Sequence, residues 1–421
     1  MQPNTLRQSK AYFPLVFLMS WLVLTIIIFI WGPWNYKLIN PFTFYSYLFL
    51  IHLALVLGYM RGQEAPGRSS RIDLDFLKWT KTAIIVSGIY FIFKSVLTAG
   101  DSFSHFIGTF RNASETYANS NLRHPTLFNY SDILFYPIFI FASVNTIYIH
   151  KKLNWWYRLA VYLMIIGTIA LSIGSAVRGQ IADILIICFA AFWLSLYSKN
   201  MVLKLYHKVL AIVFAVSVVI AFLAYSNLLV TTRGGITSIN LLTFEPPKKD
   251  YFLYEITPAS LKPLINSTSF YTSHSYYQLN KALNLPDKGI ALGLSNSYFV
   301  MDNIEQFTGW KWLKTISFGI RLDNEMAGGF GAYWSTFYTW IASDFTFPGT
   351  ILIIFLIGFL CSLALKDSLL ALNPIALTSF CTLFHFIFQF AFNNPLQDGA
   401  GIMTHLIIPL VWLILRKPEK N

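Results

Sequence analysis

Charged residues are scarce in this 421-residue chain. They make up 12% of the sequence, about half the share found in ordinary globular proteins, while hydrophobic residues make up 55% and the mean hydropathy is +0.54. A chain with so little charge cannot cover its apolar residues in water. The composition therefore excludes the soluble protein of two or three domains that the length alone would suggest.

Cysteine and the common catalytic signatures are also rare or missing. The three cysteines, Cys188, Cys361 and Cys381, lie in apolar runs without a CxxC spacing, so we expect them to be packing residues. The sequence has no HExxH, DxD, P-loop or GxSxG pattern. Metalloprotease, nucleotide hydrolase and serine hydrolase activities lose their usual support, and we expect neither a bound metal nor a cofactor.

What the sequence does have is a series of apolar runs close to the 20 residues that a helix needs to cross a bilayer. They predict an all-α polytopic membrane protein with about ten spans. The first run ends in Trp31-Gly-Pro-Trp34 without a cleavage site, so we expect it to be a retained anchor. The expected spans are 12–31, 44–60, 80–98, 131–149, 157–174, 180–198, 208–228, 346–365, 375–392 and 400–415.

The positions of Lys and Arg predict the orientation of these spans. The net charge of +12 comes mainly from segments that share one side, which the positive-inside rule makes cytoplasmic. We therefore expect both termini in the cytoplasm and no nucleic-acid partner. The chain then divides into helices 1–7 (1–228), one large outer loop (229–345), and helices 8–10 with a cytoplasmic tail (346–421).

Three arginines are expected at the outer ends of spans. Arg178 lies in a short hinge between two apolar runs, flanked by Gly174 and Gly179, and a guanidinium there suits an anion such as phosphate. A rim arginine that contacts lipid headgroups or pairs with Asp183 is the structural alternative. Arg233 and Arg321 are expected at the same outer level, where each could equally be an exposed loop charge.

The stretch from about 331 to 343 is aromatic and too short to span, which suggests an interfacial or re-entrant half-helix before the eighth span. Asp344 follows it and could simply cap the next helix. His274 lies among hydroxyl side chains and could act as a base or be merely solvated. His385 is a weaker candidate inside an apolar run.

The whole-chain layout, with about ten spans and one long outer loop late in the chain, resembles the oligosaccharide repeat-unit polymerases of the O-antigen polymerase (Wzy-type) family. Ser175-Ala-Val-Arg178-Gly179-Gln180 resembles that family's Ser-Arg-Gly segment at the start of a span. Tyr338-(x)5-Asp344-Phe345-(x)3-Gly349 resembles its Tyr-Asp-Phe-Gly segment before a late span. The chain departs from the pattern at Ala176-Val177, beside the arginine, and at Thr346, in place of a glycine.

The resemblance implies metal-independent, inverting glycosyl transfer at the periplasmic face of a bacterial inner membrane. Donor and acceptor would be polyprenyl-diphosphate-linked glycans, with a chain-length regulator and a flippase as further partners. Arginines in a low-dielectric rim could stabilise the diphosphate leaving group, and a general base would activate the acceptor hydroxyl. The candidates for the diphosphate are Arg178, Arg233 and Arg321, and those for the base are His274, Asp323, Glu325 and Asp344.

Three other classes remain open. A ligase of the same broad fold would move a finished lipid-linked glycan to a lipid core and would share the arginines. A flippase or transporter of lipid-linked sugars would place its polar residues near the midplane. A membrane O-acyltransferase would need a catalytic histidine embedded among helices, and His385 is the candidate for that role.

Overall fold

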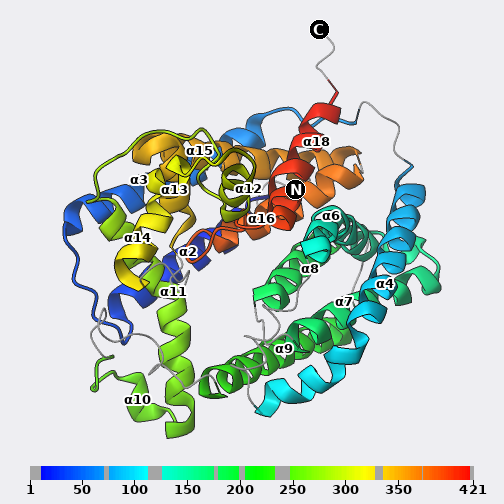
Figure 1. The fold of residues 1–421 in the computed structure, drawn as a ribbon. Helices are drawn as coiled ribbons and strands as arrows, with labels where there is room; N and C mark the ends of the chain where they lie inside the picture. Colours follow the sequence, from blue (N-terminus) through cyan, green and yellow to red (C-terminus); the bar gives the residue numbers. More distant parts are fainter. Residues whose placement is uncertain are drawn as a thin grey trace.

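The computed structural model describes residues 11–70, 75–111, 126–174, 179–198, 204–232, 247–327, 335–371 and 373–417. In these ranges the protein is built from helices and contains no strand, apart from one isolated bridge between Ser70 and Arg416 (Figure 1). The predicted all-α class is confirmed.

Seven of the described helices contain a stretch long and apolar enough to cross a membrane. They are α2 (Phe13–Trp31), α3 (Pro41–Glu64), α4 (Phe76–Arg111), α6 (Thr126–Tyr148), α7 (Trp155–Gly174), α8 (Gly179–Tyr197) and α15 (Phe337–Ala371). Shorter apolar segments lie in α9 (Leu205–Thr232), in α16 (Pro374–Gln389), and from α17 (Gly399–Ile402) through the π-helical turn η4 (Met403–Ile407) to α18 (Ile408–Leu415). Each predicted span thus falls on a helix, and the count of ten crossings stays a prediction.

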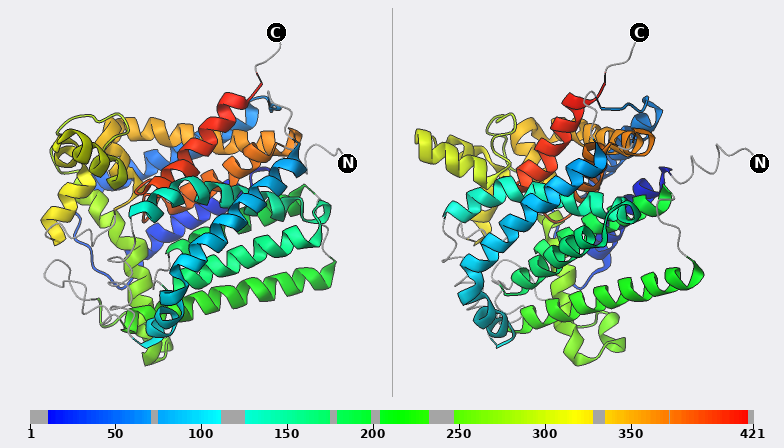
Figure 2. Two further views of the ribbon diagram at one scale, coloured as in Figure 1. Left: turned by 45° about the vertical axis from the view of Figure 1, so that its right-hand side comes forward. Right: turned by 90° about the vertical axis from the view of Figure 1, so that its right-hand side faces the viewer.

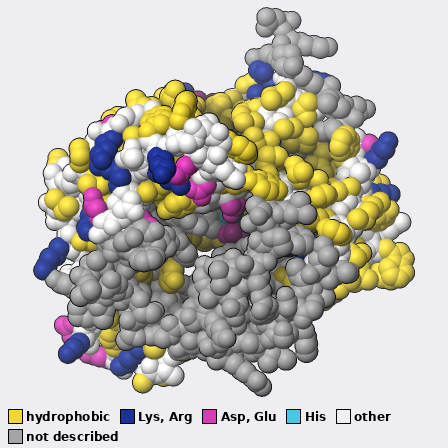
Figure 3. All heavy atoms as spheres, viewed as in Figure 1, with side chains coloured by type: hydrophobic (Ala, Val, Ile, Leu, Met, Phe, Trp, Pro, Cys, Tyr) yellow, Lys and Arg dark blue, Asp and Glu magenta, His cyan; other side chains and the backbone are white. Residues whose placement is uncertain are grey.

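The surface of the bundle is apolar in the way a lipid environment requires. Large hydrophobic side chains such as Trp31, Phe49, Ile89 and Leu163 are more than half exposed. Figure 3 shows hydrophobic side chains covering much of the described surface on one face. Soluble proteins rarely expose apolar patches of this extent, so the exposed stripes fit a protein embedded in a membrane.

The long segment between α9 and α15 is itself helical. It contains α10 (Leu253–Ile256), η3 (Ala259–Leu261), α11 (Lys262–Ala282), α12 (Tyr298–Thr308), α13 (Trp312–Ile316) and α14 (Phe318–Ala327). Its Ser- and Thr-rich composition gave no helical signal, because hydroxyl side chains compete for backbone hydrogen bonds. In α11 that competition is local: the Oγ atoms of Ser269 and Ser273 donate to carbonyls one turn back, at 2.7 and 2.5 Å.

Helices α11 to α14 gather at one end of the bundle, as the left view of Figure 2 shows. Hydrogen bonds join them to the helix ends and links found there: Asn280 accepts from the N–H of Ile39 (2.9 Å), and the N–H of Phe299 donates to the carbonyl of Gln397 (3.0 Å). We call this the loop end of the bundle.

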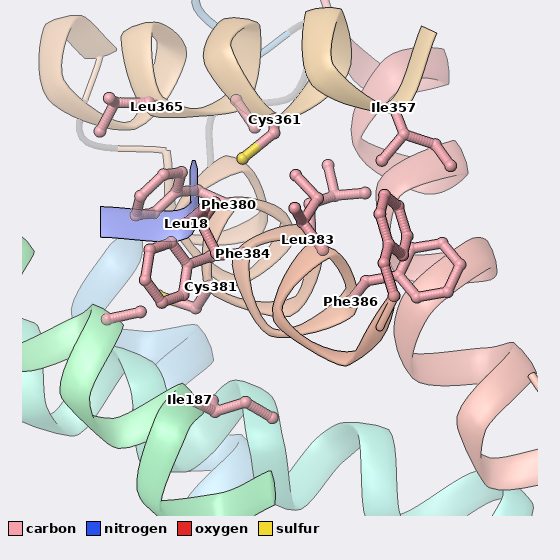
Figure 4. Packing of buried hydrophobic residues seen from close by; sticks show 14 of the residues in the cluster. Leu18, Ile187, Ile357, Cys361, Leu365, Phe380, Cys381, Leu383, Phe384 and Phe386 are labelled. Atoms are coloured by element: carbon pink, nitrogen blue, oxygen red, sulfur yellow. The ribbon is translucent and has the colours of Figure 1, made fainter. Parts of the chain in front are cut away.

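Helix α16 runs through the middle of the core. Its residues pack against α2, α6, α8 and α15 around buried side chains that include Leu18, Ile187, Cys361, Phe380 and Phe384 (Figure 4). Cys361 and Cys381 are buried in this cluster, and all three cysteines are free thiols.

At the end opposite the loop end, one buried carboxylate links several segments by hydrogen bonds. Asp367, near the end of α15, accepts from Arg416 Nε (2.7 Å), from Trp412 Nε1 (3.1 Å) and from the backbone N–H of Arg68 (2.7 Å). Lys366 donates to the carbonyls of Gln63 and Ala65 nearby. The carboxylate thereby joins α15, α18 and the link after α3 at one point.

Helices α3 and α15 approach each other unusually closely. A Cβ atom added at Gly58 would lie 2.0 Å from the carbonyl oxygen of Phe355, and one at Gly62 would lie 2.5 Å from that of Phe359. From the other side, a Cβ at Gly358 would lie 2.5 Å from the carbonyl of Leu55. Gly58 and Gly62 form a GxxxG pair, the small-residue pattern that lets membrane helices meet backbone to backbone.

We expect Gly58→Ala to destabilise the protein by about 1–3 kcal/mol, because the new methyl group forces two rigid backbones apart. Gly88→Ala in α4 is the matched control: its Cβ would meet nothing within 4 Å. Thermal unfolding of both variants in detergent, followed by the loss of the monodisperse peak, measures the difference. Equal midpoints for the two variants would contradict the close contact.

Helix α15 is broken at its loop end. Thr346 has φ 64° and ψ 168°, which separates a short helix from Phe337 to Phe345 from the long apolar helix that follows. The short helix overlaps the predicted half-helix at 331–343, of which residues 331–334 lie outside the described ranges. Positive φ is costly for a β-branched residue, so the neighbouring contacts must hold this turn in place.

Candidate functional site

Asp344 lies at the break in α15 and is completely buried. One of its oxygens accepts from the N–H (2.8 Å) and the Oγ (2.9 Å) of Ser295, and the other accepts from Asn296 Nδ2 (2.6 Å). These donors belong to the segment between α11 and α12, not to the helix after Asp344. The carboxylate therefore fixes this segment to the break and does not have the alternative role of a helix cap.

Hydrogen bonds extend this cluster to the link between α16 and α17. Asn394 Nδ2 and Gln397 Nε2 both donate to the carbonyl of Asn296, at 2.6 and 3.2 Å. Ser317 Oγ donates to the carbonyl of Ser295 (3.0 Å). Three separate segments of the loop end thus meet around Asp344.

Helix α14 holds three of the predicted site residues. Arg321 Nη1 donates to the carbonyl of Pro286 (2.9 Å), and its guanidinium lies 5.2 Å from the ring centroid of Phe318. Asp323 is buried and Glu325 is exposed. Burial and the nearby Asp323 carboxylate raise the pKa of Tyr298 to about 12, which places Asp323 beside α12.

His274 is buried in the middle of α11. Its Nδ1 lies 2.9 Å from the carbonyl of Phe270, and the two rings stack at 4.6 Å with an interplanar angle of 6°. The side chain is therefore packed within the protein, and the alternative prediction of a solvated histidine is wrong. Its role as a base stays a prediction.

Arg178 and Arg233 lie outside the described residues. Their neighbours in sequence are described: Arg178 directly precedes Gly179, where α8 begins, and Arg233 directly follows Thr232, where α9 ends. Whether the three arginines meet is therefore still a prediction.

A second buried polar cluster connects α8, α16 and η4. His385 Nε2 lies 2.9 Å from Asp183 Oδ1, and His385 Nδ1 lies 2.8 Å from His405 Nε2. His405 Nδ1 in turn lies 3.0 Å from the carbonyl of Gly401. Gln389 Nε2 donates to the same Asp183 oxygen at 2.6 Å. The result is a continuous chain of hydrogen-bonding groups between helices.

Other charged groups lie close to this chain. Asp132 on α6 accepts from Lys94 (2.7 Å) and from the hydroxyl of Tyr90 (2.7 Å). Asp398 caps α17 by accepting from the N–H of Gly401 (2.6 Å). Figure 3 shows acidic side chains beside a histidine near the centre of one face.

Sequence reasoning treated Asp183 only as a partner for Arg178, and His385 only as the candidate for a different class of enzyme. The available signal was the presence of ionisable residues within apolar runs, which usually marks a functional position. What no local pattern reveals is that residues 183, 385 and 405 meet.

Comparisons with protein-family models, with curated proteins and with solved structures find no match to this chain. Among the described residues, no group of three or more His, Cys, Asp or Glu side chains is arranged to hold a metal ion.

Proposed function

We propose that this protein is a membrane glycosyltransferase that joins polyprenyl-diphosphate-linked oligosaccharide units into a surface polysaccharide. The donor loses its lipid diphosphate, and a hydroxyl of the acceptor glycan takes its place. The reaction occurs at the loop end of the bundle, which we assign to the outer, periplasmic face of a bacterial inner membrane.

One observation supports this proposal more than any other. The hydrogen-bonded pair of Asp183 and His385 lies about one turn into α8, whose first residue directly follows Arg178. Glycosyl transfer from a diphosphate needs a cation for the leaving group and a group that takes a proton from the attacking hydroxyl. One short segment of chain carries a residue suited to each task.

The same features weigh on the alternatives. An acyltransferase histidine must keep a ring nitrogen for the acceptor hydroxyl, whereas both ring nitrogens of His385 are engaged within the protein. A transporter places its polar residues near the midplane, whereas these groups lie toward the loop end, beside the link after α16. A ligase would use the same site and differ only in its acceptor.

The test is the glycan profile of a deletion strain, with and without the wild-type gene, together with the products that the purified protein forms from lipid-linked repeat units. Single repeat units on the lipid core in the deletion strain, and lipid-linked polymer in vitro, are the expected results. Loss of all attached glycan with accumulated lipid-linked polymer would indicate a ligase instead. Lipid-linked single units confined to the cytoplasmic leaflet would indicate a flippase.

A further inference from the structure

Hydrogen-bond chemistry determines which group donates and which accepts in the series Gly401, His405, His385 and Asp183. A backbone carbonyl can only accept, so His405 must carry its proton on Nδ1 to bond Gly401. In neutral His405 the other nitrogen, Nε2, is then an acceptor, and His385 must donate to it from Nδ1. The carbonyl of Gly401 thus determines which nitrogen donates in both His405 and His385.

The last contact of the chain requires one more proton. With Nδ1 of His385 already protonated, the 2.9 Å contact between His385 Nε2 and Asp183 Oδ1 is a hydrogen bond only if a proton lies between them. The pair is either an imidazolium with a carboxylate or an imidazole with a carboxylic acid. His405, by accepting from His385 Nδ1, holds the ring with Nε2 toward Asp183.

The two oxygens of Asp183 have different surroundings. Oδ1 takes the contacts from His385 and Gln389, whereas in the part of the chain that the structure describes no hydrogen bond reaches Oδ2. The Asp183 side chain is 28% exposed and that of His385 is 2% exposed. One oxygen is thus anchored within the bundle while the carboxylate still reaches the surface.

His405, which contacts His385, lies in an irregular turn of its helix. Residues 403–407 form a π-helical turn, η4, between two α-helical segments. An inserted residue of this kind changes the direction of a side chain and is frequent at functional sites. Here the turn carries the residue that bonds His385, so the backbone irregularity and the hydrogen-bonded chain point to the same place.

From this arrangement we infer that Asp183 is the general base of the proposed glycosyl transfer, and that His385 and His405 are its positioning residues. The acceptor oxygen bonds to the anomeric carbon of the donor as the bond from that carbon to the diphosphate breaks. The electron pair leaves with the diphosphate, and the hydroxyl proton passes to Asp183 Oδ2 and then to water. This inference rests on the proposed function and adds a base that sequence reasoning had not selected.

The experiment measures the initial rate of polymer formation by purified protein from lipid-linked repeat units. Asp183→Asn retains an acceptor oxygen for Gln389 but cannot take the proton, so we expect the rate to fall by at least roughly 10²-fold. Asp183→Glu, which keeps the carboxylate on a longer side chain, should recover part of it. Asp132→Asn is the matched control, and we expect its rate to stay within about threefold of wild type, because Lys94 already holds that carboxylate.

Separate measurements of kcat and KM distinguish positioning from simple structural support. His405→Leu should lower kcat more than it changes KM, because His385 then loses the acceptor at Nδ1 that fixes its ring and Asp183 is held less firmly in place. The charged and titratable groups near the pair are Asp132 with Lys94, Asp398, and Tyr136 on α6, and the kcat and KM of Asp132→Asn measure the contribution of that neighbouring carboxylate.

The outcomes are distinguishable. Wild-type protein that forms no polymer contradicts the proposed function. Wild-type protein that forms polymer, together with Asp183→Asn at a rate within threefold of it, overturns the inference alone. If Asp183→Asn fails to fold, the His405→Leu kinetics decide: an unchanged kcat overturns the inference, and a fall in kcat with a nearly constant KM supports it.

Discussion

Arg178→Ala should abolish most polymer formation while the protein stays at normal abundance in the membrane. Removing one preorganised group that stabilises developing negative charge typically costs roughly 10²- to 10³-fold in kcat, and the proposed diphosphate leaving group develops such charge. Arg178 lies directly before α8, so it is close in sequence to Asp183, which contacts His385. Polymer formation by purified protein, with a fixed concentration of lipid-linked donor, measures the loss.

Two further variants sharpen this test. Arg178→Lys keeps the charge but loses the planar fork that bonds two phosphate oxygens together, so we expect an intermediate rate. Arg61→Ala is the matched control, since Arg61 forms an exposed pair with Glu64 (2.7 Å) near the end of α3. A rate for Arg178→Ala equal to that of Arg61→Ala would remove Arg178 from the site.

Asp344→Ala should separate the loop end from the break in α15. The substitution leaves the N–H and Oγ of Ser295 and the Nδ2 of Asn296 without their acceptor, and each unmet buried donor costs about 1–3 kcal/mol. We expect a large fall in the thermal midpoint and proteolytic cleavage between α11 and α12. Limited proteolysis in detergent, followed by mass spectrometry, locates the cut.

A charge swap distinguishes this clamp from the predicted role of Asp344 as a base. In the double variant Asp344→Asn with Asn296→Asp, the new amide can still accept from Ser295 and can donate to the new carboxylate. The weaker contact from Asn296 Nδ2 to the carbonyl of Gly293 (3.4 Å) is lost. Recovery of both stability and polymer formation indicates a clamp, whereas recovery of stability alone indicates that the carboxylate must be at position 344 for catalysis.

The amount of helix and the membrane class could be read from the sequence because both depend on local composition. Apolar runs near 20 residues fix where helices cross a bilayer whatever their neighbours are. A short helix was also predicted from the aromatic stretch before Asp344, and the helix from Phe337 to Phe345 overlaps it, whereas its interfacial or re-entrant position stays a prediction. In contrast, α11 and α14 fall within a segment predicted as an outer loop, because α11 is rich in hydroxyl side chains and α14 is only 10 residues long. Contacts with α2, α9 and α15 stabilise α11, and contacts with α15 stabilise α14.

The candidate site shows the same division more sharply. The sequence by itself determined that Arg178 lies in a short hinge five residues before Asp183 and that His385 lies in an apolar run. Only the tertiary structure decided that Asp183, His385 and His405 form one chain, and that Asp344 holds Ser295 and Asn296. Hydropathy is a property of neighbours in sequence, whereas a hydrogen bond between residues some 200 positions apart depends on how whole helices pack against each other.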